Sequence, residues 1–165
     1  MKKLSLYLLI MAIGLVAYSQ KIDKSQVPEA VKKMYEVKTN DTLTPAWEKN
    51  GEIYTANFTK GELKAHVEIN SKAEWQKTVW VMPYQYVPQK IKDNVATGYV
   101  GFKVVKASIQ YRTDGDYYVI EAKKKKVIQT IFYNLKSEFV KVEGNTPPVK
   151  SNDKDVRPEE KEKTE

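Results

Sequence analysis

Apolar residues along the chain follow helical spacing in one stretch and then alternate with polar residues in the next. Val27, Val31 and Tyr35 recur on one helix face, and Pro28 suits a first helical turn, so a helix ending by about Thr39 is predicted. Between residues 47 and 82 apolar and polar residues alternate, as they do on half-buried strands. Turn signals divide this stretch into four predicted strands, 47–49, 53–60, 63–70 and 74–82.

The same pattern then starts again. Val87-Pro88 repeats Val27-Pro28 at an offset of 60, and residues 131–141 repeat residues 67–77 at an offset of 64. Self-similarity at a fixed spacing indicates two copies of one structural unit. The copies are expected to span about 25–82 and about 85–143.

These patterns predict an α+β fold made of two tandem helix-plus-antiparallel-meander repeats. The strands would form one sheet with the helices packed on one face, because each strand set has one apolar side to bury. The opposite face is left to solvent or to a partner. With Tyr111 aligned to Trp47, the two offsets also predict about four extra residues between the second helix and its strands.

The two ends of the chain differ from the repeats. Lys2 and Lys3 precede an apolar run from Leu4 to Ala17, which is typical of a signal peptide over 1–19 with cleavage after Ser19. The apolar run is short for a membrane anchor, so a periplasmic or secreted protein without a membrane span is expected. Residues 144–165 are rich in proline and charge, and are predicted to be a disordered tail.

Composition narrows the chemistry. The 165 residues carry 28 basic and 21 acidic side chains, a net charge of +7, and no cysteine. Disulfides, thiol catalysis and cysteine metal sites are therefore excluded. A basic domain favours an anionic partner, but Arg112 is the only arginine in 20–143, and phosphate and base recognition relies on arginine, so nucleic acid is not expected.

The repeated sequence motifs resemble those of a known family. They are Val27-Pro28-x-x-Val31 and Trp47-Glu48-Lys49-x-Gly51-x-x-Tyr54, with Val87-Pro88-x-x-Ile91 and Gly115-x-x-Tyr118 in the second copy. They are similar to the PepSY-like family of exported bacterial domains, also described as beta-lactamase-inhibitor-like. The chain departs from its pattern where glycine is expected, at Ala73 and Ser137. The resemblance implies a non-enzymatic periplasmic binding or inhibitor-like domain, with no catalytic residue and no cofactor.

Few residues suggest catalysis or metal binding. His66 is the single histidine and lies between Lys64 and Glu68 in an alternating strand, which is typical of a solvated surface residue. Asp114-Gly115-Asp116 fits a hairpin turn better than a calcium loop, which needs more oxygen ligands. No catalytic residue and no metal site is predicted. An enzyme would need a cleft that gathers carboxylates such as Asp114, Asp116 and Glu121.

Aromatic residues are the unusual feature, numbering 18 in all. Several lie outside the predicted core face or in the segment between the copies, and they are the candidate partner-binding residues: Trp75, Trp80, Tyr84, Tyr86, Tyr117 and Phe132. The alternative interpretation is that they cover sheet edges or pack between the copies. The sequence thus predicts a non-enzymatic cell-envelope binding module, inhibitor-like, with an aromatic and Lys-rich sheet face for a protein or anionic partner. The second hypothesis is a small-ligand carrier with a pocket between helices and sheet.

Overall fold

The computed structural model describes residues 19–40 and 43–144. The predicted signal peptide, apart from Ser19, and the predicted tail beyond Gly144 lie outside these residues. Within these residues two helices and nine strands follow each other. Their bounds are β1 (Gln20–Ile22), α1 (Glu29–Thr39), β2 (Ala46–Asn50), β3 (Ile53–Lys60), β4 (Leu63–Asn70), β5 (Trp75–Met82), α2 (Gln89–Gly98), β6 (Lys103–Arg112), β7 (Gly115–Lys124), β8 (Val127–Asn134) and β9 (Phe139–Gly144). Short 3-10 helices, η1 (Lys24–Gln26) and η2 (Tyr84–Tyr86), precede α1 and α2.

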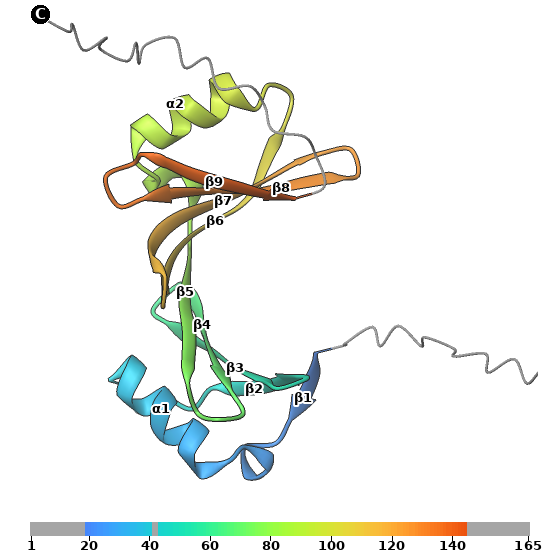
Figure 1. The fold of residues 1–165 in the computed structure, drawn as a ribbon, viewed down its shortest axis with the longest axis vertical. Coiled ribbons are helices and arrows are strands. Elements are labelled where there is room, and N and C mark those ends of the chain that lie inside the picture. Colours follow the sequence, from blue (N-terminus) through green and yellow to red (C-terminus); the bar gives the residue numbers. More distant parts are fainter. Residues whose placement is uncertain (1–18, 41–42, 145–165) are drawn as a thin grey trace, which may run out of the picture.

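All nine strands form one antiparallel sheet in which the spatial order equals the order along the chain (Figure 1). Each copy contributes a helix followed by a meander, and α1 and α2 pack on the same face of the sheet. The register across β5 shows this: Ala65 of the first core lies opposite Trp80, and Met82, two residues further along the same face of β5, lies opposite Ala107 of the second core. The predicted α+β architecture is confirmed.

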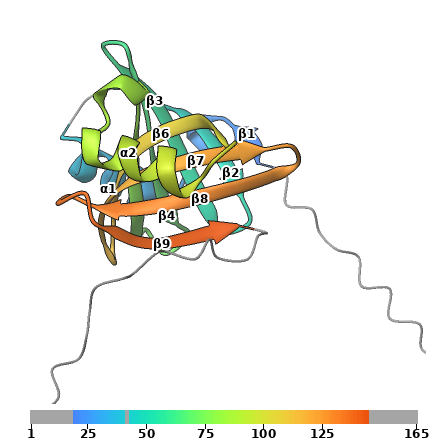
Figure 2. The same ribbon diagram turned by 90° about the horizontal axis from the view of Figure 1, so that it is seen from above.

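Each helix builds a hydrophobic core of its own against this face. Val31 and Tyr35 of α1 are buried with side chains of β2–β4, and Ile91 and Val95 of α2 are buried with side chains of β6–β8. Figure 2 shows α2 lying over the strands of the second copy. These apolar positions recur at helical spacing, so burial of one stripe per helix accounts for both packings.

The sheet bends strongly between the two copies. In Figure 1 both helices lie on the outer side of the bend, and the face without helices lies on the inner side. We call this inner side the helix-free face; it carries the alternate residues of each strand, among them Glu68, Val79, Ser108, Val119 and Phe132. Val79, Ser108 and Val119 are 1% exposed although neither α1 nor α2 covers them. Side chains around them on the curved surface bury them instead.

The copies differ in the length of one hairpin, and the predicted position of the four extra residues is wrong. Trp47 lies opposite Ala56 in β2–β3, whereas Ala107 lies opposite Ile120 in β6–β7. Trp47 therefore corresponds to Ala107 and not to Tyr111. The insertion adds two residues to each strand of the β6–β7 hairpin. The prediction was wrong because it aligned the two turn signals, although the second hairpin is longer than the first.

The extra hairpin residues join the two copies. Tyr111 lies opposite Thr78 and Arg112 opposite Lys77, so β6 pairs along most of β5. Strand β1, which the sequence did not predict, is the first copy's equivalent of the end of β5. Ile22 lies opposite Trp47 just as Met82 lies opposite Ala107.

The repeated Asn-x-Lys-x-Glu stretch is a turn motif. The Oδ1 atom of Asn70 accepts hydrogen bonds from the backbone N–H groups of Lys72 and Glu74, at 3.0 and 2.9 Å, and its Nδ2 donates to the Glu74 carboxylate at 2.6 Å. Ala73 adopts a φ of 61° and Ser137 a φ of 62°, so the turn keeps a left-handed residue without glycine. The second copy makes the same three bonds at 2.7–3.0 Å through Asn134, Lys136 and Glu138.

Candidate functional site

Two of the six candidate aromatic residues complete the first core. Trp75 and Trp80 are half-buried on the helix side of the sheet and pack against that core. The indole N–H of Trp75 donates to the Thr78 hydroxyl at 3.0 Å, and the Lys38 ammonium lies 4.3 Å from the centre of its ring. Trp80 meets Phe58 edge to face, with 5.5 Å between ring centres. These contacts fit the alternative interpretation of the aromatic residues as packing groups.

Two further candidates lie in η2, between the copies. Tyr84 is half-buried and packs against the second core. Burial raises the pKa of the Tyr84 hydroxyl, and the negative charge of Asp93 raises it further. Tyr86 has 66% of its surface exposed. The two tyrosines therefore face different surroundings, and only Tyr86 is openly accessible.

Tyr117 and Phe132 lie together on the helix-free face, with ring centres 5.8 Å apart. The expectation that Phe132 is exposed is wrong, since only 2% of its surface is accessible. The Arg112 guanidinium lies 5.6 Å and the Lys141 ammonium 4.8 Å from the centre of its ring. Alternation placed Phe132 on the correct face, but these neighbours cover it. We call Arg112, Tyr117, Phe132 and Lys141 the Phe132 cluster.

Ion pairs surround the Phe132 cluster along the same face and at the β6–β7 turn. Each joins a lysine or arginine to a nearby carboxylate over 2.7–3.2 Å. Such half-exposed pairs contribute little to stability, about 0–1 kcal/mol each, so their groups are free to take new partners at small cost. The pairs are Lys77–Glu68, Lys106–Glu121, Arg112–Asp114 and Lys141–Glu143.

Glu68 is the most strongly influenced carboxylate of this group. Burial alone raises its pKa, but the neighbouring imidazole of His66 and the charge of Lys77 outweigh burial and hold the pKa below the ordinary value of 4.5. The His66 Nε2 lies 3.6 Å from the Glu68 Oε1, and 22% of the His66 side chain is exposed. His66 is thus half-buried beside a carboxylate, rather than fully solvated as its position in an alternating strand suggested.

The carboxylates that an enzyme would need do not converge. Asp114 lies in the β6–β7 turn, and Asp116 and Glu121 lie at alternate phases of β7, so they point to opposite faces of the sheet. Within residues 19–40 and 43–144, no three of the acidic, histidine or cysteine side chains form a group that could hold a metal ion. In the same ranges, neither helix has the length and apolar character needed to cross a membrane.

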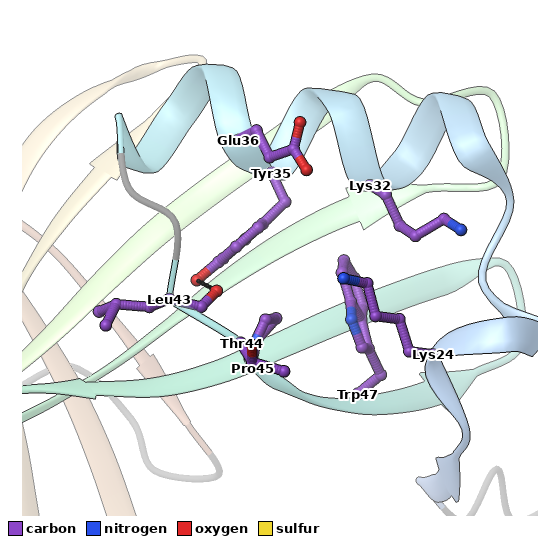
Figure 3. Close-up of a pocket in the computed structure, with 8 residues that line it drawn as sticks. All are labelled: Lys24, Lys32, Tyr35, Glu36, Leu43, Thr44, Pro45 and Trp47. Carbon is purple, nitrogen blue, oxygen red and sulfur yellow. Dashed lines mark hydrogen bonds between the residues drawn. The ribbon is translucent and has the colours of Figure 1, made fainter.

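A small cavity lies on the other side of the sheet, between α1, η1 and β2 (Figure 3). Its volume is about 150 Å³. The Tyr35 hydroxyl donates to the Leu43 carbonyl at 3.4 Å and closes one end, while Lys24, Lys32 and Trp47 lie at the other end (Figure 3). The residues that line the cavity are Lys24, Lys32, Tyr35, Glu36, Leu43, Thr44, Pro45 and Trp47.

Neither the protein-family models nor the curated proteins include a match to the sequence. Solved structures do match. A DUF2874 family protein from Bacteroides ovatus has a TM-score of 0.61 at 16% identity, over 71% of this chain and 86% of that one. A BLIP-like protein from Bacteroides fragilis has a TM-score of 0.61 at 12% identity, over 79% and 93%. A Bacteroides eggerthii protein described as periplasmic has a TM-score of 0.59 at 17% identity, over 72% and 88%.

The fold of this chain is therefore similar to that of a BLIP-like protein. At identities of 12–17% the likeness establishes the fold, and it covers most of each related chain. The resemblance to PepSY-like, beta-lactamase-inhibitor-like domains that the repeated sequence marks predicted is confirmed at this level.

Proposed function

We propose that this chain is a non-enzymatic binding module of the cell envelope, inhibitor-like in its mode of action, that captures a protein on its helix-free face. The observation that carries the proposal is the contrast between the two faces. Both helices cover one side of the sheet, whereas on the other side no element of residues 19–40 and 43–144 covers the Phe132 cluster and its ion pairs. The BLIP-like fold and the periplasmic relative support the same function.

The charge pattern favours a protein over a uniformly anionic ligand. Lys77, Lys106 and Lys141 each lie beside a carboxylate, so positive and negative groups are interspersed on the face. A partner surface with complementary charges of both signs would replace these pairs one by one, and such complementarity gives specificity. Tyr117 and Arg112 belong to the residue types that anchor protein interfaces.

Site-specific photo-crosslinking tests which face binds. A photoreactive amino acid at Tyr117, on the helix-free face, should yield a covalent adduct with one envelope protein, identified by mass spectrometry. The same substitution at Tyr86, which is 66% exposed near α2, is the matched control and should yield none.

The identified protein is then purified and its affinity measured by calorimetry. Lys77→Glu combined with Lys141→Glu should weaken binding at least tenfold, because both reverse a charge on the helix-free face. Lys33→Glu combined with Lys90→Glu makes the same charge change on the exposed sides of the helices and should alter the affinity less than twofold. Adducts from Tyr86 alone would show that the helix side binds, and equal losses for both pairs would show that total charge rather than one face governs binding; either result contradicts the proposal.

A further inference from the structure

The cavity beneath α1 contains a buried donor that points to a ligand. Trp47 is 3% exposed and lines the cavity, and its indole N–H has no hydrogen-bond acceptor among the described residues. A buried donor without an acceptor is costly, and native proteins rarely leave one. At about 150 Å³ the cavity, which is partly open to solvent, is several times larger than one water needs.

The charges around Trp47 favour an anion. Lys24 and Lys32 lie at the same end of the cavity as the indole (Figure 3). The Lys32 ammonium pairs with Glu29 at 2.7 Å, but 69% of the Glu29 side chain is exposed, so this pair is a weak competitor for a ligand. Glu36 is the acidic member of the lining, and in Figure 3 it lies near Tyr35, away from the Trp47 end.

The apolar side chains of the cavity lining indicate which kind of anion would fit. The rings of Tyr35 and Trp47 meet edge to face at 5.7 Å, and Leu43 and Pro45 complete an apolar lining. The cavity lining holds no arginine to bind a phosphate in a bidentate manner, and a strongly hydrated phosphate would gain nothing from the apolar walls. A carboxylate on a flat apolar body matches both the donors and the walls.

Comparison of the two copies shows that the cavity is specific to the first. Lys24 of η1 corresponds to Tyr84 of η2 at an offset of 60, and Tyr84 packs against the second core. Trp47 corresponds to Ala107, and Lys32 to Lys92, whose ammonium donates to the Gln85 carbonyl at 3.0 Å. The second copy therefore lacks the indole donor, and its lysine is bonded to the backbone at the corresponding position.

We propose that the cavity between α1, η1 and β2 binds a small organic carboxylate. The Trp47 indole N–H donates to the carboxylate, Lys24 and Lys32 neutralise its charge, and the rings of Trp47 and Tyr35 contact its apolar part. The site lies on the helix side of the sheet, so it is separate from the helix-free face and independent of the function proposed above.

Benzoate is the probe, added to the full chain and followed by two-dimensional NMR of the three tryptophan indole N–H groups. Trp47→Phe assigns the Trp47 signal. Benzoate should shift this signal saturably and leave those of Trp75 and Trp80 in place. Lys24→Gln with Lys32→Gln should weaken the affinity at least tenfold, whereas Lys92→Gln, the matched change in the second copy, should alter it less than twofold.

Two comparison ligands complete the test. Benzamide, which has the same shape without the charge, should bind at least tenfold more weakly than benzoate, and inorganic phosphate should leave the Trp47 signal in place. The proposal is overturned by equal binding of benzamide, which means an apolar cavity only, or by equal binding of phosphate. It is also overturned if benzoate produces no saturable shift, which means that water alone occupies the cavity.

Discussion

At the scale of single residues, the two copies have different side chains at the same left-handed position of a turn. The β3–β4 turn has Gly61 at a φ of 59°, and the corresponding β7–β8 turn has Lys125 at a φ of 56°. A side chain in this left-handed region costs about 1–2 kcal/mol, because Cβ approaches the following carbonyl oxygen. The second copy therefore keeps strain that the first avoids.

Lys125→Gly should raise the free energy of unfolding by about 0.5–1 kcal/mol, since relief of strain exceeds the added flexibility of the unfolded chain. Urea denaturation measures the change. Lys126→Gly is the control, because Lys126 is not among the positive-φ residues, and there glycine should bring no gain. Equal effects of the two substitutions would point to relief of repulsion within the run of lysines 123–126 instead.

Glu68 makes stability depend on acid pH. Its pKa is below 4.5 in the folded protein, so the folded state binds this proton at a lower pH than the unfolded state does. The resulting stabilisation is present above about pH 4.5 and is lost as the pH falls through the folded pKa. Glu68→Gln should therefore flatten the decline in unfolding free energy between about pH 5 and pH 3, measured by urea titration. Glu143→Gln, in a more exposed pair, serves as the control, and parallel curves for the Glu68 variant and the parent would contradict the prediction.

At the scale of elements, periodicity, turn signals and internal repetition together predicted both helices and eight of the nine strands found in the described residues. They missed β1 because three residues are too few to show alternation and their partner, β2, is more than 20 residues away. The alignment of Trp47 with Tyr111 was wrong because turn residues show where a hairpin ends but not how long its strands are. Each of these errors concerns pairing between segments, which local pattern does not encode.

The candidate site was less accessible to sequence reasoning than the fold. Phe132 was assigned to the correct face, but its burial depends on Arg112 and Lys141 reaching across from β6 and β9. The cavity depends on Lys24 and Trp47, which approach only after η1 and β2 have packed. A comparison of the copies at the offset of 60 would have provided a signal, since it pairs Lys24 with Tyr84.

At the scale of the whole molecule, two separate cores share one strand. In β5, Trp80 packs against the first core and Met82 against the second. Loss of either core therefore removes support from a strand on which the other depends, and β5–β6 pairing joins the copies further. This arrangement predicts that the copies unfold together.

Ile91→Ala tests this coupling, because Ile91 is fully buried in the second core while all three tryptophans lie in or against the first. The substitution should cost about 2–5 kcal/mol. Tryptophan fluorescence and far-ultraviolet circular dichroism should report the same lowered midpoint, and Lys90→Ala, exposed on the same helix, should leave it nearly unchanged. A fluorescence midpoint equal to that of the parent would show that the first copy unfolds alone.

The identity of spatial and sequential strand order has a consequence for how quickly the chain reaches this structure. Every strand pairs with the one just before it, and only the helix-containing connections, 23–45 and 83–102, are longer than a short turn. Bringing each pair of strands together therefore costs little conformational entropy. The sheet, although large, has the low contact order that is typical of rapidly folding domains. A chain that emerges gradually, end first, finds each partner strand already formed behind it, so folding need not wait for synthesis or transport to finish.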